Sequence, residues 1–63
     1  MKEGKVKFFN VTKGFGFITP LNGGEDIFVH SSGLETEIRE NDDVVFEVEN
    51  GRKGLNAVNV RLA

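Results

Sequence analysis

The 63-residue sequence has no cysteine, tryptophan or tyrosine, and it has only one histidine and one proline. Without cysteine the chain can form neither disulfides nor thiolate metal sites, which excludes the class of disulfide-framed secreted miniproteins. A single histidine also excludes the usual zinc ligand sets. We therefore expect the chain to fold without covalent or metal cross-links.

Long hydrophobic runs are missing as well. No stretch approaches the roughly 18 apolar residues of a membrane-spanning helix. Residues 1–10 (MKEGKVKFFN) lack the apolar run and the cleavage site of a signal peptide. Hydrophobic residues make up 38% of the chain, which suffices for one small core. The sequence predicts a single domain over residues 1–63, located in the cytoplasm and without a membrane partner.

Charge is nearly balanced overall but unevenly distributed along the chain. Eight basic and ten acidic residues give a net charge of −2, which by itself argues against nucleic acid as a partner. Residues 1–20 carry four lysines and one glutamate, residues 21–50 nine carboxylates and one arginine, and residues 51–63 three basic residues and no acidic one. Both ends are therefore basic, so one face of the folded chain could be locally positive.

Short apolar runs separated by glycine-containing turns predict strands rather than helices. Five runs have this character: residues 5–10, 15–19, 26–30, 43–49 and 55–62. In the last run, alternation sets Val58, Val60 and Leu62 against Ala57, Asn59 and Arg61. Only residues 32–39 could form a helical turn. Five strands at about ten-residue spacing predict an all-β fold, a small five-stranded antiparallel barrel.

Aromatic residues occupy unexpected positions in the second and third predicted strands. If Ile18, Ile27 and Val29 fill the barrel, period-two alternation directs four rings outward. These rings are Phe15, Phe17, Phe28 and His30. Lys7 and Lys13 border the patch. Exposed rings beside lysines suit single-stranded nucleic acid, because bases stack on rings with about 1–3 kcal/mol each and ammonium groups meet phosphates.

The aromatic residues and the carboxylates also allow three alternatives. Phenylalanines in strands are usually buried, so the rings could belong to the core. An exposed aromatic patch could instead dock a protein partner. Catalysis is the weakest option, because adjacent carboxylates such as Glu25–Asp26 and Asp42–Asp43 face opposite sides of a strand. We expect these pairs to keep the back surface soluble, and we expect no enzyme activity.

Two motifs resemble those of the cold shock domain family. Residues 13–18 (KGFGFI) look like its first RNA-binding motif and residues 27–30 (IFVH) like its second. The opening GKVKFFN and the closing NAVNV are also similar, so the likeness covers nearly the whole chain. It implies a Greek-key barrel of the oligonucleotide-binding type (OB-fold). It further implies a bacterial cold shock protein that binds single-stranded RNA and DNA as an RNA chaperone and transcription antiterminator.

Matched position by position, the resemblance implies nine nucleic-acid-binding residues. They are Lys7, Phe8, Asn10, Lys13, Phe15, Phe17, Phe28, His30 and Lys53. We expect a monomer with no cofactor and no small-molecule substrate. Phe8 stands where the family usually has tryptophan, and Ser31 where an aromatic residue usually follows the histidine. The connection 32–43 is shorter than usual and lacks aromatics, so we expect fewer base subsites and weaker binding.

The first two predicted strands carry two further expectations. A side chain at Gly16 would crowd a tightly curved barrel. Strict alternation puts Lys7 and Phe8 on opposite faces, whereas the resemblance implies that both reach the ligand. A β-bulge or a strong twist near Lys7 would reconcile the two.

Part of the sequence also resembles another family. Residues 27–34 (IFVHSSGL) partly resemble ribosome-associated barrels of the S1-like type, although residues 13–18 fit that type less well. Ribosome association without preference for free single strands would distinguish this alternative.

Overall fold

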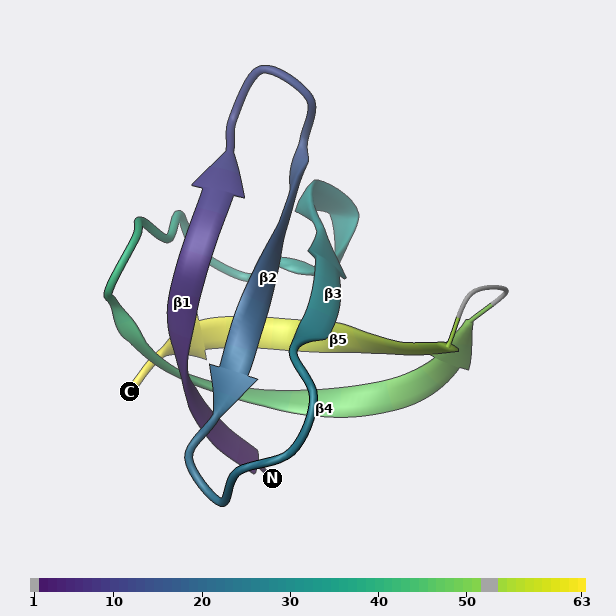
Figure 1. Cartoon of the computed structure of the whole chain (residues 1–63). Coiled ribbons are helices and arrows are strands. Elements are labelled where there is room, and N and C mark those ends of the chain that lie inside the picture. Colours follow the sequence, from purple (N-terminus) through teal and green to yellow (C-terminus); the bar gives the residue numbers. More distant parts are fainter. Residues whose placement is uncertain (1, 52–53) are drawn as a thin grey trace.

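The computed structural model describes residues 2–51 and 54–63, which form a closed five-stranded barrel. Its elements are β1 (Lys2–Asn10), β2 (Phe15–Pro20), β3 (Ile27–His30), the short 3₁₀ helix η1 (Ser31–Gly33), β4 (Asp43–Gly51) and β5 (Gly54–Leu62). The strand order around the barrel is β1-β2-β3-β5-β4 (Figure 1). The all-β barrel is therefore confirmed, and in the described ranges no helix is long and apolar enough to cross a membrane.

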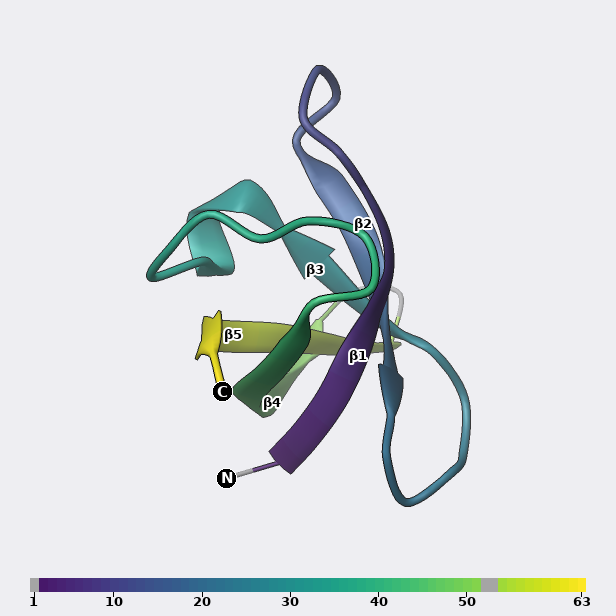
Figure 2. The same ribbon diagram turned by 90° about the vertical axis from the view of Figure 1, so that its left-hand side faces the viewer.

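The barrel consists of a three-stranded sheet, β1-β2-β3, crossed by the β4–β5 hairpin (Figure 1). The pairs β1–β2, β2–β3, β1–β4 and β4–β5 are antiparallel, whereas β3 and β5 close the barrel through a short parallel contact. Figure 2 shows β4, β5 and the connection after β3 on one side of the three-stranded sheet. None of the described strands covers its other face, which is left to the side chains of β1, β2 and β3.

The core is almost entirely aliphatic. Its buried residues are Val6, Ile18, Ile27, Val29, Ile38, Val44, Phe46, Ala57 and Val60, and Phe46 is the one ring among them. The aliphatic residues Ile18, Ile27 and Val29 point inward as alternation predicts, with exposed fractions of 0%, 6% and 0%. Because these side chains fill the interior, their strand neighbours must face outward.

A β-bulge interrupts the β1–β2 ladder at Lys7. Val6 pairs with Ile18, but Phe8 pairs with Phe17, so the register shifts by one residue between Val6 and Phe8. The extra residue lets Lys7 and Phe8 reach the same face, which settles the conflict within the predicted first strand in favour of a bulge.

A second bulge, in β5, makes the alternation expected for residues 55–62 wrong. Val45 pairs with Arg61 and Glu47 with Val58, so two β5 residues oppose Phe46. Asn59 takes a φ of +54° there. As a result Ala57 and Val60 are both buried, although strict alternation placed them on opposite faces. The helical turn predicted within residues 32–39 is also only partly present. The structure has the single turn of η1, which begins one residue earlier, at Ser31.

Gly16 lets β1 and β2 approach closely. A Cβ atom at this position would collide with the carbonyl oxygen of Phe8 and lie 2.8 Å from the Cα of Phe9. The crowding expected at Gly16 is thus present, and it comes from the backbone of the neighbouring strand.

Candidate nucleic-acid interface

Six of the predicted site residues form two rows across the uncovered face of the β1-β2-β3 sheet. In one row Phe8 pairs with Phe17 and Phe17 with Phe28. In the other row Asn10 pairs with Phe15 and Phe15 with His30. We call these six residues the ring face. Period-two alternation on three adjacent strands, together with the Lys7 bulge, brings them together.

The four phenylalanines of the ring face touch one another in an unbroken chain. The ring centroids of Phe8 and Phe17 are 5.5 Å apart and those of Phe17 and Phe28 are 5.8 Å apart. Phe28 then lies 5.8 Å from Phe15, with ring planes inclined by only 24°. Phe8 is 36% exposed and the other three are half-buried. Mutual contact thus stabilises rings that face solvent, because aromatic pairs contribute about 0.5–1.5 kcal/mol beyond burial.

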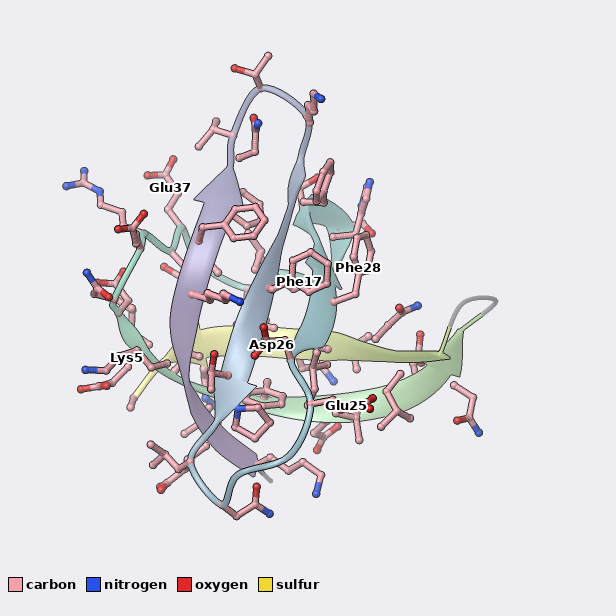
Figure 3. All side chains as sticks on the ribbon, viewed as in Figure 1. Lys5, Phe17, Glu25, Asp26, Phe28 and Glu37 are labelled. Atoms are coloured by element: carbon pink, nitrogen blue, oxygen red, sulfur yellow. The ribbon has the colours of Figure 1, made fainter. Side chains whose placement is uncertain are left out.

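A polar row borders the phenylalanine row. The Lys7 ammonium donates to Asp26 Oδ2 at 3.0 Å, and the Thr19 hydroxyl donates to Asp26 Oδ1 at 3.0 Å. These two hydrogen bonds, that from Lys7 first, hold the pKa of the Asp26 carboxyl below its ordinary value of 3.8. Figure 3 shows Asp26 on the same face as Phe17 and Phe28. The interface therefore contains a carboxylate that neutralises one of the three predicted phosphate-binding lysines.

The predicted site residues do not include Thr19 and Asp26. The Glu25–Asp26 pair was expected on the back surface, which is wrong for Asp26. The signal was available, because Thr19 lies two residues after Phe17 and Asp26 two residues before Phe28, so alternation puts both on the ring face.

Asn10 and Lys13 lie where the β1–β2 hairpin turns. The Asn10 carbonyl accepts from the Gly14 N–H at 2.7 Å, and the Asn10 side-chain oxygen accepts from the Lys13 N–H at 3.0 Å. Asn10 therefore shapes the turn that carries Lys13 to the margin of the ring face. The Lys13 side chain is exposed and has no ion pair among the residues that the structure describes. The remaining predicted residue, Lys53, lies outside the described residues.

An open groove of about 470 Å³ continues the ring face beyond Phe17 and Phe28. Its other walls include Lys2, Pro20, Asn22, Glu25 and Leu55. The groove joins the ring face to the first residues of β5, so an extended ligand has a path past the two central rings. Among residues 2–51 and 54–63, no group of three or more histidine or carboxylate side chains is arranged to hold a metal ion.

Comparison with known proteins gives one consistent family. The family model described as the 'Cold-shock' DNA-binding domain matches residues 2–63. The chain is 52% identical over 63 residues to Cold shock-like protein CspC of Shigella flexneri, covering 92% of this chain and 90% of that protein. It is 50% identical over 62 residues to Cold shock-like protein CspE of Escherichia coli K12, with the same coverage.

The fold comparison agrees. A solved structure described as drosophila Unr CSD456 matches with a TM-score of 0.80 and 25% sequence identity, covering 98% of this chain and 26% of that chain. The resemblance carried by residues 13–18 and 27–30 is thereby confirmed. The barrel, the motifs and relatives that match over nine-tenths of their length show that the chain belongs to the cold-shock domain family, whose proteins are of the nucleic-acid-binding type.

Proposed function

We propose that this chain binds single-stranded RNA and DNA by stacking bases on the ring face. The observation that carries the proposal is the continuous chain of four touching phenylalanines, on a sheet face that the other described strands leave uncovered. Each half-buried ring keeps an accessible surface for one base, and stacking contributes about 1–3 kcal/mol per base with little dependence on base identity. A duplex hides its base faces, so the ring face selects single strands.

The proposal includes the residue roles and the biological setting. Phe8, Phe15, Phe17, Phe28 and His30 are the stacking platforms. Asn10 shapes the adjacent turn, and Lys7, Lys13 and Lys53 meet phosphates. Residues 1–63 act as one monomeric domain in the cytoplasm, without catalysis, as an RNA chaperone and transcription antiterminator like the family that the chain belongs to.

Binding is expected to be weaker than a full set of aromatic platforms would give. Phe8 offers a smaller surface than tryptophan, Ser31 is an exposed hydroxyl, and residues 34–42 contribute no ring. The ring face therefore ends at His30 and Phe15. The match to cold shock-like proteins does not favour the alternatives of an S1-like barrel or a protein-docking patch.

The test is replacement of Phe15, Phe17 and Phe28 together by alanine. Binding of a short oligothymidine is followed by amide NMR shifts, because the chain has no tryptophan or tyrosine. Loss of three platforms should weaken binding at least about a hundredfold. The matched control is Leu62→Ala, which truncates a 50%-exposed side chain on β5. Unchanged affinity in a folded triple variant, or equal affinity for the duplex form of the oligomer, would refute the proposal.

A further inference from the structure

His30 has two structural roles at the end of β3. It belongs to the ring face opposite Phe15, and it is also the N-cap residue of η1, with an extended backbone (φ −104°, ψ 152°). N-cap side chains accept a hydrogen bond from a main-chain N–H two or three residues later. Histidine is an unusual residue for this position. The capping hydrogen bond fixes the orientation of its ring, and base stacking alone does not require such a bond.

The capping contact determines which ring nitrogen carries the proton. The main-chain N–H of Ser32 donates to Nδ1 of His30 at 3.2 Å. The Ser32 hydroxyl also lies 3.0 Å from Nδ1, and a hydroxyl can donate or accept. A main-chain N–H can only donate, so Nδ1 must keep its lone pair. In the neutral imidazole the proton is then on Nε2, which the cap leaves without a partner among the described residues.

We propose that Ser32 is a positioning residue that holds His30 in the Nε2–H tautomer, so that His30 offers a bound strand one neutral N–H donor as well as a ring surface. The inference rests on the proposed function, since it assigns recognition chemistry to the same face. Its ligand is a nucleobase with an acceptor at its edge, such as a thymine or uracil carbonyl oxygen.

The cap also makes His30 better suited to donate to a base as a neutral imidazole than to bind a phosphate as a cation. An imidazolium carries protons on both nitrogens, so Nδ1 could no longer accept from Ser32 and the cap would be lost. Lys13, which has no ion pair among the described residues, can meet a phosphate without such a loss. The capped His30 is therefore suited to a base edge, and its fixed ring loses little rotamer freedom when a base arrives.

The tautomer can be observed directly because the chain has one histidine. In the ring ¹⁵N spectrum of the free protein near neutral pH, we expect a protonated Nε2 and an unprotonated Nδ1. A scalar coupling across the N–H···N hydrogen bond should join the Ser32 amide nitrogen to Nδ1. Ser32→Ala removes the hydroxyl and keeps the main-chain donor, so both signals should persist. A protonated Nδ1, or no coupling in either protein, would overturn the inference.

Two substitutions separate the cap from the ring in binding. His30→Phe keeps a platform but removes the cap and the donor, whereas His30→Asn keeps a capping acceptor and removes the ring. A short oligothymidine is scanned with 2,4-difluorotoluene, a thymine isostere without good acceptors. At one position the isostere should weaken binding to the unmodified protein about threefold to tenfold, the value of one neutral hydrogen bond, and should leave binding to His30→Phe unchanged.

The outcomes separate this inference from the proposed function. If no position of the isostere distinguishes the unmodified protein from His30→Phe, the donor role of His30 is wrong while stacking stands. If the oligomer does not bind at all, or the triple phenylalanine variant binds it equally well, the proposed function itself fails. His30→Asn should lose affinity in either case, since it lacks a platform, while its η1 amide signals should stay in place.

Discussion

Replacing Asp26 with asparagine would release Lys7 from the only ion pair that the described residues give it on the ring face. In the native chain the Lys7 ammonium lies 3.0 Å from Asp26 Oδ2, so a phosphate must compete with a carboxylate that is already in place. The amide of Asp26→Asn keeps the size of the side chain and an oxygen acceptor for the Thr19 hydroxyl, but it carries no charge. Lys7 then becomes available to a bound strand.

The expected magnitude concerns the salt dependence of binding. For single strands, each neutralised phosphate contributes about −0.7 to the slope of log affinity against log salt concentration. Asp26→Asn should therefore steepen the slope by about 0.7, whatever the other basic residues contribute. Between roughly 50 and 200 mM salt, this corresponds to about a 2.5-fold larger loss of affinity than in the unmodified protein.

The assay is a titration of a short oligothymidine at several salt concentrations, with Glu40→Gln as the matched control. Glu40 lies in the connection before β4, is exposed, and forms no ion pair within the described ranges, so its neutralisation changes the net charge equally and leaves Lys7 paired. Equal slopes for the two variants would show that Lys7 does not gain a phosphate when Asp26 is neutralised. The reasoning that Asp26 competes with phosphate would then be wrong.

Three further predictions concern stability. Phe46→Ala removes the one ring in the buried core at a cost of about 3–5 kcal/mol, a large part of the ~3–9 kcal/mol expected for a domain of this size, so circular dichroism should show a much lower melting temperature. Gly16→Ala should lower the urea midpoint further than Gly23→Ala, because Gly16 faces the β1 backbone and Gly23, with a φ of +84°, has open space and only local strain. A smaller effect at Gly16 would mean that β1 and β2 can separate freely. The hydrogen bonds from Lys7 and Thr19 favour the ionised Asp26 carboxylate and lower its pKa. As the pH falls below about 4 and Asp26 becomes protonated, the unmodified protein should therefore lose stability relative to Asp26→Asn. Acid unfolding curves that run parallel for the two proteins would contradict this.

The outward position of the rings could be predicted from the sequence because it depends on local alternation alone. Ile18, Ile27 and Val29 occupy every second position, so whichever face they choose, the rings must take the other. Burial of the aliphatic set is the more favourable choice in a barrel too narrow for several rings. The same alternation, extended from Phe28 to Asp26, places Asp26 on the ring face. The expectation that Asp26 lies on the back surface was therefore avoidable from the sequence.

Which residues of β5 face the core could not be predicted in this way. Asn59 takes a left-handed conformation, which inserts an extra residue opposite Phe46 and brings Ala57 and Val60 to the same interior. A period of two holds only while each residue is extended. Asparagine tolerates a positive φ better than most residues, but that tolerance alone does not distinguish Asn59 from the other asparagines of the chain. The bulge follows from the need of two crossing strands to bend around one core, which is a property of the closed barrel.

Three local devices together account for how so small a barrel can hold its rings toward solvent. An aliphatic interior leaves Phe8, Phe15, Phe17 and Phe28 outside. Gly16 lets β1 approach β2 closely, and the bulge at Lys7 brings Phe8 into line with Phe17. The contacts between neighbouring rings offset part of the cost of exposing them. Because Asp26 neutralises Lys7 at the margin, we expect the face to attract a strand mainly through its rings. A surface of this kind should bind single strands with a shallow salt dependence and with little preference among bases, except where a fixed donor such as His30 forms a hydrogen bond with the edge of a base.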